Sequence, residues 1–322
     1  MSKHKCVVIG LYVGLTGLSA HAAEPYPNRS IRFIVPYTPG AINDFVARLV
    51  AQKLTDLWGK SVVVDNRPGG GTLIGTDLVA KASPDGYTLL LVPTAFAINV
   101  SLYPKLPYDT VKDFTAVTQI GTGPYVMACN MSLPIKNVKD LVAHAKAHPG
   151  TLSYASTGSG GSAHLMGEML KAMTGIDMAH IPYKGLTPGL TDVSSGQVSC
   201  TFGTLVAVGG LIKAGRLRAL ALTGSVRSKA APDIPTIAES GYPEYQASGW
   251  WGVVLPARAS LAITEKIQKD ISDLLSEAEV KEKLAAQGVD IVGSRPAAFK
   301  QFIQEETVRW ARAVKLSGAK PD

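Results

Sequence analysis

The sequence has no hydrophobic run long enough to cross a membrane and no dense cluster of basic residues. Its most apolar segment, residues 6–18, has 13 residues, whereas about 20 are needed to span a bilayer. The formal net charge is +7, but the lysines and arginines are dispersed and no stripe of aromatic residues lies among them. These absences argue against a membrane anchor and against nucleic-acid binding, and leave anionic ligands as partners for the excess positive charge.

Motifs typical of several enzyme classes are also absent. The chain contains neither a G-x-S-x-G nucleophile elbow nor an H-E-x-x-H metal motif. The run Gly158–Gly161 lacks the lysine of a phosphate-binding P-loop and the third glycine of a dinucleotide-binding fingerprint. His144 and His148 have a spacing that can hold a metal, but without a Cys or carboxylate partner a solvated helix face is favoured. We therefore expect no catalysis, no metal and no cofactor.

The N-terminus has the pattern of a cleavable secretory signal peptide. Two lysines precede the apolar segment 6–18, and Ala20-His21-Ala22 supplies the small residues of a cleavage site. We predict cleavage after Ala22, so that residues 1–22 are the signal peptide. Cys6 lies at the start of the apolar segment and not at the cleavage point, so it is not placed for lipid attachment. The mature chain is expected to be soluble and exported to the periplasm.

Export leaves two cysteines in an oxidising compartment. Cys129 and Cys200 both lie in strand-like runs, and they form either one disulfide or two buried thiols. A bridge requires neighbouring strands whose side chains point the same way.

From Ile31 onward, strand-like and helix-like segments alternate, which predicts mostly parallel sheets covered by helices. Strands are expected at 31–35, 61–64, 87–92, 126–129, 152–156, 178–182, 198–202, 217–222, 250–255 and 289–292. Helices are expected after the first Gly turn, at 73–80, from Val138, Ser162, Pro188 and Val206, at 263–275 and 277–287, and from a Ser294 cap to a Gly318 stop.

This order predicts an α/β protein of two lobes joined by two crossings. Residues 24–124 with 245–322 would form a discontinuous lobe 1, and residues 125–244 would form lobe 2, inserted between them. A chain that crosses twice forms a hinge, and hinge closure around a ligand is the expected motion.

Two Gly-rich turns, Pro39–Asp44 and Ser156–Ser162, each follow a strand-like run and precede a helix. Free backbone N–H groups at such a helix start point beyond the strand end, where the helix dipole favours an anion. One such turn is weak evidence. Two of them in separate halves predict a common anion-binding cleft between the lobes.

Five motifs, in chain order, resemble the Bug family of extracytoplasmic solute receptors. They are Val35–Gly40 with Asp44, Val64–Gly69, Pro84–Leu89, Tyr154–Ser156 with Gly158 and His164-Leu165, and Ile181–Gly185 with Pro188. The resemblance runs from about residue 27 to 318. It implies a periplasmic, monomeric binding protein with the two-lobed type II (Venus-flytrap) architecture. Such a protein captures a small carboxylate and delivers it to the membrane subunits, TctA/TctB-like, of a tripartite tricarboxylate transporter. A ligand sensor with a membrane signalling partner is the alternative.

By the same resemblance, the ligand carboxylate is held by main-chain amides and bridging waters of both turns. The expected ligand-binding residues of the turns are Thr38, Pro39, Gly40, Ala41, Asn43, Asp44, Ser156, Thr157, Gly158, Ser159, Gly160 and Ser162. Asp44 either accepts from a ligand hydroxyl or amine, or caps its own helix. His164 either supports its loop or touches the ligand. The remaining expected pocket residues are Phe96, Tyr183, Lys184, Gly203 and Thr204.

Some of these positions depart from the family pattern and bear on specificity. Ala41 stands where many relatives have a second glycine, and Gly203-Thr204 stands where they carry Asp-Asn. Loss of that acidic group favours a plain carboxylate over an amino acid. Phe96 suggests a more apolar distal pocket, suited to an aromatic or hydroxylated acid. Lys184 either brings charge to the cleft or is solvated, and Arg67 either orients loops through a carboxylate or contacts the ligand.

Overall fold

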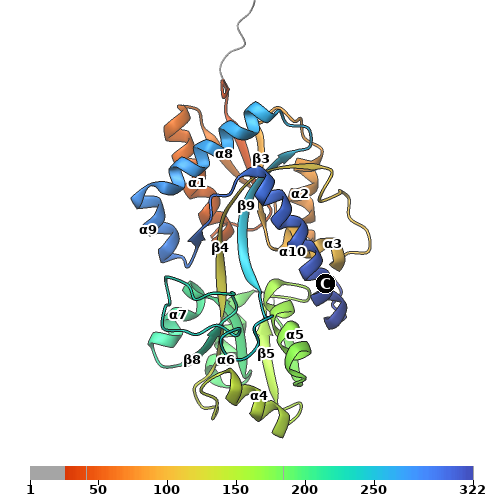
Figure 1. Cartoon of the computed structure of the whole chain (residues 1–322), viewed down its shortest axis with the longest axis vertical. Helices are drawn as coiled ribbons and strands as arrows, with labels where there is room; N and C mark the ends of the chain where they lie inside the picture. The colour runs from red at the N-terminus through yellow and green to blue at the C-terminus, as the bar shows by residue number, and fades with distance from the viewer. Residues whose placement is uncertain (1–25, 41, 184, 322) are drawn as a thin grey trace, which may run out of the picture.

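The structure, a computed structural model, describes residues 26–40, 42–183 and 185–321 (Figure 1). The expected signal peptide, Ala41 and Lys184 lie outside the described residues. Within these ranges no helix is both long and apolar enough to span a bilayer.

Lobe 1, at the top of Figure 1, is built on three parallel strands, β1 (Ile31–Val35), β2 (Val62–Asn66) and β3 (Thr88–Pro93). The antiparallel strands β9 (Ser248–Pro256) and β4 (Phe114–Asn130) extend this sheet in the order β2-β1-β3-β9-β4, and the short β10 (Asp290–Ile291) also pairs with β4. Its helices are α1 (Ile42–Trp58), α2 (Leu73–Ala80), α3 (Ala95–Leu102), α8 (Leu261–Ser276), α9 (Ala278–Ala286) and α10 (Pro296–Ser317).

Lobe 2 repeats the plan with three parallel strands, β5 (Leu152–Ser156), β6 (Met178–Pro182) and β7 (Cys200–Thr204). The second half of β4 pairs antiparallel with β7 and with β8 (Leu217–Leu222). The covering helices are α4 (Val138–Ala147), α5 (Ser162–Thr174), α6 (Leu186–Ser195) and α7 (Leu205–Lys213). Each lobe therefore has the three parallel strands that the alternating pattern predicts, but the antiparallel strands β4, β8, β9 and β10 make the sheet mixed and not mostly parallel.

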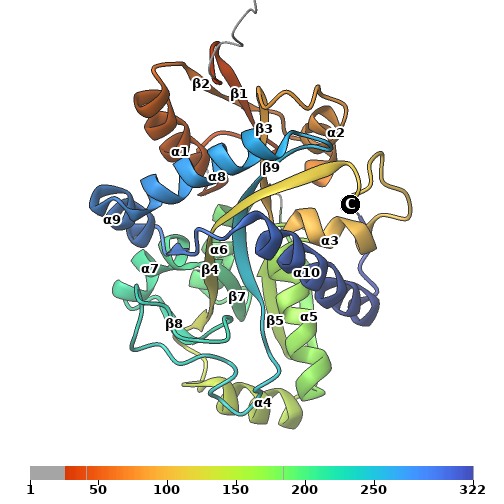
Figure 2. The same ribbon diagram turned by 45° about the horizontal axis from the view of Figure 1, so that its top comes forward.

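The two lobes are connected by strands that run through both. Residues 114–124 of β4 pair with β9, whereas residues 125–130 pair with β7 and β8. In Figures 1 and 2, β4 and β9 run lengthwise between the upper and lower groups of helices. The partner of β4 therefore changes between Pro124 and Tyr125, and the bounds of the two lobes stay a prediction.

Helix α10 adds a second link between the lobes. It begins in lobe 1, packs on α3, and reaches α5 of lobe 2 (Figure 2). Glu306 anchors it: the buried carboxylate accepts from the indole N–H of Trp250 on β9 (2.9 Å), from that of Trp310 (2.8 Å) and from Arg309. Burial raises the pKa of Glu306 in spite of these donors. The sequence did not predict this helix to bridge the lobes.

Several local expectations are changed by the structure. Ser294 does not cap α10, because Arg295 is the N-cap residue and Pro296 begins the helix. The Ser294 hydroxyl instead accepts from the Gln119 N–H at 2.9 Å. Gly318 ends the helix in a left-handed conformation, as expected. The strand 114–124 and the helix α3 were missed.

The two cysteines face each other across β4 and β7, in directly paired register, and form a disulfide. Both side chains are fully buried. The bridge closes a loop with a sequence separation of 71 residues within lobe 2. Of the two alternatives that the sequence leaves open, the structure has the disulfide.

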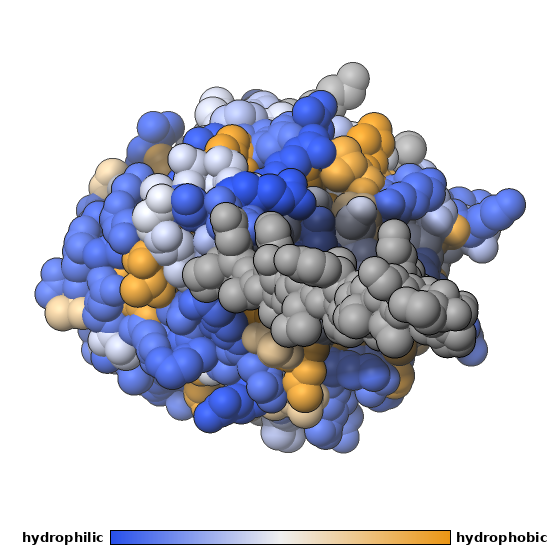
Figure 3. Space-filling model, turned by 90° about the horizontal axis from the view of Figure 1, so that it is seen from above, coloured by the Kyte–Doolittle hydropathy of each residue, from blue (hydrophilic) through white to orange (hydrophobic). Residues whose placement is uncertain are grey.

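Figure 3 shows the molecule from the lobe 1 end. The part of this face that is not covered by grey atoms is mainly hydrophilic, and its apolar residues lie in separate spots. Isolated exposed apolar side chains are usual on protein surfaces. The visible part of this end therefore shows no large apolar patch.

Candidate functional site

A cleft of about 470 Å³ lies between the lobes, where loops from both of them meet. Its lining residues come from a first loop (Pro36–Gly40), a second loop (Pro68–Thr72), a third loop (Thr157–Gly161) and helix α3. They are Pro36, Tyr37, Thr38, Pro68, Gly69, Gly70, Gly71, Thr72, Ala95, Asn99, Leu102, Tyr103, Thr157, Gly158, Ser159, Gly160 and Gly161. The structure thus brings the second Gly-rich turn that the sequence singled out, at Thr157–Gly161, to the same cleft as Thr38, which directly precedes the first.

The first loop is held in place by Asp44 in the first turn of α1. Its buried carboxylate accepts from the Gly40 N–H (3.0 Å), Arg48 (2.9 Å) and Asn66 (2.9 Å). Asn66 also donates to the carbonyl of Tyr37 (3.0 Å). Burial acts to raise the pKa of Asp44, but the hydrogen bonds from Arg48, Gly40 and Asn66 outweigh it and lower that pKa. Of the two roles expected for Asp44, its contacts match the structural one.

The third loop is held by side chains beneath it. The Gly160 N–H donates to Nδ1 of His164 (2.9 Å), and the Gly158 N–H donates to the hydroxyl of Ser156 (3.2 Å). That hydroxyl also contacts Nε2 of His180 at 2.6 Å. His164 therefore supports the loop, which is one of the two roles expected for it.

These contacts correct the expected use of the glycines. The N–H groups of Gly40, Gly158 and Gly160 donate to side chains next to their own loops instead of pointing unpaired into the cleft. The three glycines are required for backbone shape, because their φ values of +93°, +133° and +76° disfavour other residues. Gly160 is also required for close approach, since a Cβ there would lie 2.5 Å from a methyl group of Leu102 in lobe 1.

The second loop is the part of the cleft that sequence reasoning missed. Gly69, Gly70, Gly71 and Thr72 all have positive φ, and Thr72 is buried in this unusual conformation at φ +86°. The amide of Asn99 on α3 donates to the Gly71 carbonyl (2.8 Å) and to the Thr72 hydroxyl (3.0 Å). Three consecutive glycines were visible in the sequence, but they were interpreted only as a break between elements.

The described residues that line the cleft are all uncharged. None of the described residues that line it is Asp, Glu, Lys, Arg or His. Instead, helices α2, α3 and α5 all begin at or next to the lining residues, and no side chain caps α2 or α5. Helix N-termini carry partial positive charge and unsatisfied N–H groups. The described lining therefore offers an anion helix N-termini and neutral donors.

Two phenols add neutral donors near this site. Tyr37 lines the cleft, and Tyr125 on β4 hydrogen-bonds to Ser162 at the start of α5. Burial raises the pKa of both tyrosines. Tyr125 lies close enough to Tyr37 to raise the pKa of Tyr37 further. Both hydroxyls therefore remain protonated at neutral pH.

Other expected pocket residues do not line the cleft. Asn43 accepts from the indole of Trp251 (2.7 Å), and Phe96 is buried against Phe114 with ring centroids 5.2 Å apart. The Tyr183 hydroxyl donates to Asp192 at 2.6 Å, and this bond raises the pKa of Tyr183 to about 12. Pro39, Gly40, Asp44, Ser156, Ser162, His164, Gly203 and Thr204 are also absent from the lining. The expectations for Ala41 and Lys184 fall outside the described residues.

Phe96 was expected in the pocket because it follows β3. The structure places it on the inner side of α3, while Ala95 and Asn99 of the same helix face the cleft. The residue at which α3 begins decides which of its side chains face the cleft. A single aromatic residue in the sequence does not reveal how the helix is rotated. Arg67 pairs with Asp65 at 2.9 Å, in line with the structural alternative.

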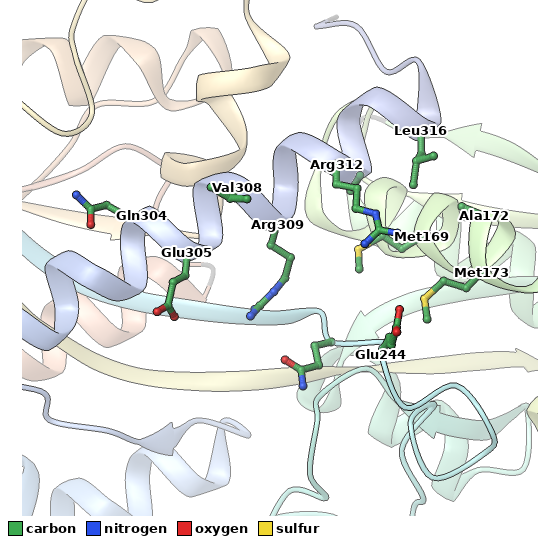
Figure 4. Close-up of a pocket in the computed structure, with 12 residues that line it drawn as sticks. Met169, Ala172, Met173, Glu244, Gln304, Glu305, Val308, Arg309, Arg312 and Leu316 are labelled. Carbon is green, nitrogen blue, oxygen red and sulfur yellow. The ribbon is translucent and has the colours of Figure 1, made fainter.

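A larger pocket of about 890 Å³ lies elsewhere, between α5 and α10. Figure 4 shows Met169 and Met173 on α5 facing Arg309, Arg312 and other side chains of α10. None of the expected ligand-binding residues lines it. We call it the α5–α10 pocket.

Comparison with known proteins decides the family. The family model described as "Tripartite tricarboxylate transporter family receptor" matches residues 46–318. The chain belongs to this receptor family. Among the curated relatives of this receptor, Protein BugT of Bordetella pertussis is 40% identical over 316 residues, which cover 97% of each chain.

Solved structures similar to this receptor include two with a named acid. "R. palustris Rpa4515 with adipate" has 33% sequence identity and a TM-score of 0.82, with 92% of this chain and 100% of that chain covered. "MatC (Rpa3494) from Rhodopseudomonas palustris with bound malate" has 28% identity and a TM-score of 0.77, with 90% and 100% covered. The two-lobed α/β fold of solute-binding proteins is thereby established for this receptor.

Proposed function

We propose that this receptor works in the periplasm, captures a small carboxylate in the cleft between its lobes, and delivers it to a tripartite tricarboxylate transporter. One observation carries this proposal: loops from both lobes, each next to a helix N-terminus, enclose one cavity of about 470 Å³. Export to the periplasm is supported by the expected signal peptide and by the family. The chemistry assigned is binding and release, without conversion of the ligand.

The lining favours a dicarboxylate without an amino group. Helix N-termini and the hydroxyls of Thr38 and Thr157 offer donors to carboxylate oxygens. An ammonium group would meet no acidic side chain among the described lining residues, and an unpaired buried charge is costly. Adipate and malate in two related structures are consistent with this class.

We further propose that residues 24–124 with 245–322 move as one body and residues 125–244 as the other. The crossing strands β4 and β9 supply the hinge, because β4 pairs with strands of both lobes and β9 leads from lobe 2 back into lobe 1. The contact of Gly160 in lobe 2 with Leu102 in lobe 1 would form as the lobes close. The closed form is the one that the transporter would receive.

The proposal is tested by thermal-shift measurements on the mature receptor. A panel of adipate, malate, benzoate and glutamate separates dicarboxylates, hydroxy acids, aromatic acids and amino acids. A bound ligand raises the melting temperature according to its occupancy. We expect a rise with adipate or malate and none with glutamate, and the ligand should be recovered unchanged.

A matched pair of variants ties the effect to the cleft. Thr157→Val removes a hydroxyl from the third loop and should reduce the rise, whereas Thr187→Val, exposed on α6, should leave it as in the wild type. A panel in which no acid shifts the melting temperature, or turnover of the acid by the receptor, would contradict the proposal.

A further inference from the structure

Two imidazole rings stack beneath the third loop. His164 on α5 and His180 on β6 have ring centroids 3.8 Å apart and an interplanar angle of 12°. His164 is buried, with 7% of its surface exposed. The pair lies directly under the residues of lobe 2 that line the cleft, so its protonation state bears on their position.

Each ring is connected to one glycine N–H of the third loop. His164 accepts from Gly160 through Nδ1 at 2.9 Å. Nε2 of His180 lies 2.6 Å from the Ser156 hydroxyl, which accepts from the Gly158 N–H and donates to the Gly158 carbonyl at 3.0 Å. The conformation of residues 158–160 therefore depends on both imidazoles.

The bond to Gly160 sets a condition on His164. An imidazole nitrogen accepts a hydrogen bond only when it carries no proton, and the charged form has N–H groups at both positions. Protonation of His164 would place its Nδ1–H against the Gly160 N–H. The loop would then lose this bond and change its position relative to Leu102. Gly160 packs so closely on Leu102 that there is no room for a methyl group between them.

The described groups next to the two histidines are a carboxylate, an ammonium group and two phenols. Glu168 on the same helix has Oε1 4.0 Å from Nε2 of His164, and it accepts from Lys171 (2.9 Å) and Tyr154 (2.7 Å). Tyr154 on β5 and Tyr245 also face this region, and burial raises the pKa of both phenols. Both phenols therefore stay protonated near neutral pH, whereas an ordinary imidazole changes its charge between about pH 5 and 8.

We propose that His164 and His180 are positioning residues for the third loop, and that ligand binding requires His164 to be neutral. This inference rests on the proposed carboxylate site and adds a regulation of that site by pH. Acidification breaks the hydrogen bond between Gly160 and His164 and so changes the conformation of the third loop. The described residues that line the cleft are uncharged and do not themselves change. Affinity for the acid falls as the pH falls through the range where imidazole titrates.

The first experiment measures adipate binding calorimetrically from about pH 8 to about pH 6. If the protonated form does not bind, an imidazole with an ordinary pKa near 6.5 weakens binding about fourfold at about pH 6. His164→Asn places an amide oxygen near the position of Nδ1 and cannot titrate. This variant should bind adipate at about pH 8 and lose the decline.

Any decline caused by protonation of adipate itself remains in His164→Asn, so the difference between the two profiles isolates the imidazole. His148→Asn, at the exposed end of α4, is the matched control and should keep the wild-type profile. His164→Leu, which has no acceptor, should bind weakly at every pH. Identical pH profiles for the wild type and His164→Asn would overturn the proposal.

A second measurement does not depend on a ligand. In nuclear magnetic resonance spectra of the ligand-free receptor, the amide signals of Gly158 and Gly160 should titrate together, and the Gly160 signal should stop titrating in His164→Asn. A Gly160 signal that is constant across this pH range would refute the role of His164. Absence of adipate binding at every pH, with a titrating Gly160 signal, would instead contradict only the proposed ligand.

Discussion

The contact between Gly160 and Leu102 gives the sharpest prediction about closure of the cleft. Gly160 belongs to the third loop in lobe 2, and Leu102 ends α3 in lobe 1. In Gly160→Ala the added Cβ would lie 2.5 and 2.7 Å from the two methyl groups of Leu102. Because carbon atoms prefer separations of about 3.5–4.0 Å, the loop or Leu102 must move by about 1 Å.

Two costs are expected, and they act on different measurements. The φ of +76° at Gly160 disfavours alanine by about 1–2 kcal/mol, which lowers the stability of the fold. Overpacking against Leu102 costs about 1–3 kcal/mol more. Because Gly160 and Leu102 belong to different lobes, this cost opposes closure of the cleft and therefore weakens ligand binding. Affinity for adipate should therefore fall about 5-fold to 150-fold.

Gly175→Ala is the matched control, because Gly175 lies at the other end of α5. Its φ of +69° is nearly the same, but a Cβ there would meet no atom within 4 Å. This variant should lose stability like Gly160→Ala while binding adipate normally. Calorimetric titration and thermal unfolding measure the two effects separately.

A relief variant completes the test. Adding Leu102→Ala to Gly160→Ala removes the steric conflict, and should recover most of the affinity at a further cost in stability from the buried leucine. The reasoning fails if Gly160→Ala binds adipate as tightly as Gly175→Ala does.

Three further predictions concern stability. Replacing Cys129 and Cys200 together by alanine should cost about 4 kcal/mol in denaturant unfolding, given the 71-residue separation, without weakening adipate binding; an unchanged midpoint would contradict this. Asp44→Ala should cost about 2 kcal/mol at neutral pH. Because the pKa of Asp44 is lowered by folding, this gap should close as the pH falls below about 4, and a gap that stays constant would be evidence against it. For Glu306, whose pKa is raised by folding, Glu306→Gln should gain relative to the wild type as the pH rises from about 4 to 7, and parallel stability curves would disprove the assignment.

Local sequence patterns predicted most of the secondary structure. The strands 152–156, 178–182 and 217–222 and the helix 73–80 have the predicted bounds, because apolar runs and Gly or Pro breaks coincide there. The strand 114–124 was missed since it contains glycine, proline and threonines and lacks a continuous apolar run. Its pairing with β9, more than a hundred residues later, is a long-range contact that no local window contains.

The candidate site was also predictable where local sequence patterns form it, and not where long-range contacts do. The first and third loops were recognisable because a strand, a Gly-rich turn and a helix start follow one another in the sequence. Which way an N–H points was not recognisable, since Asp44 and His164 take the glycine amides only in the folded geometry. The role of α3 depends on its rotation, which places Asn99 toward the cleft and Phe96 toward the core.

A crystal structure of the mature receptor with adipate tests the central claim most directly. We predict a carboxylate group seated between the first, second and third loops, within hydrogen-bond distance of neutral donors from both lobes. Adipate bound instead in the α5–α10 pocket, or a carboxylate in contact with one lobe alone, would contradict the account.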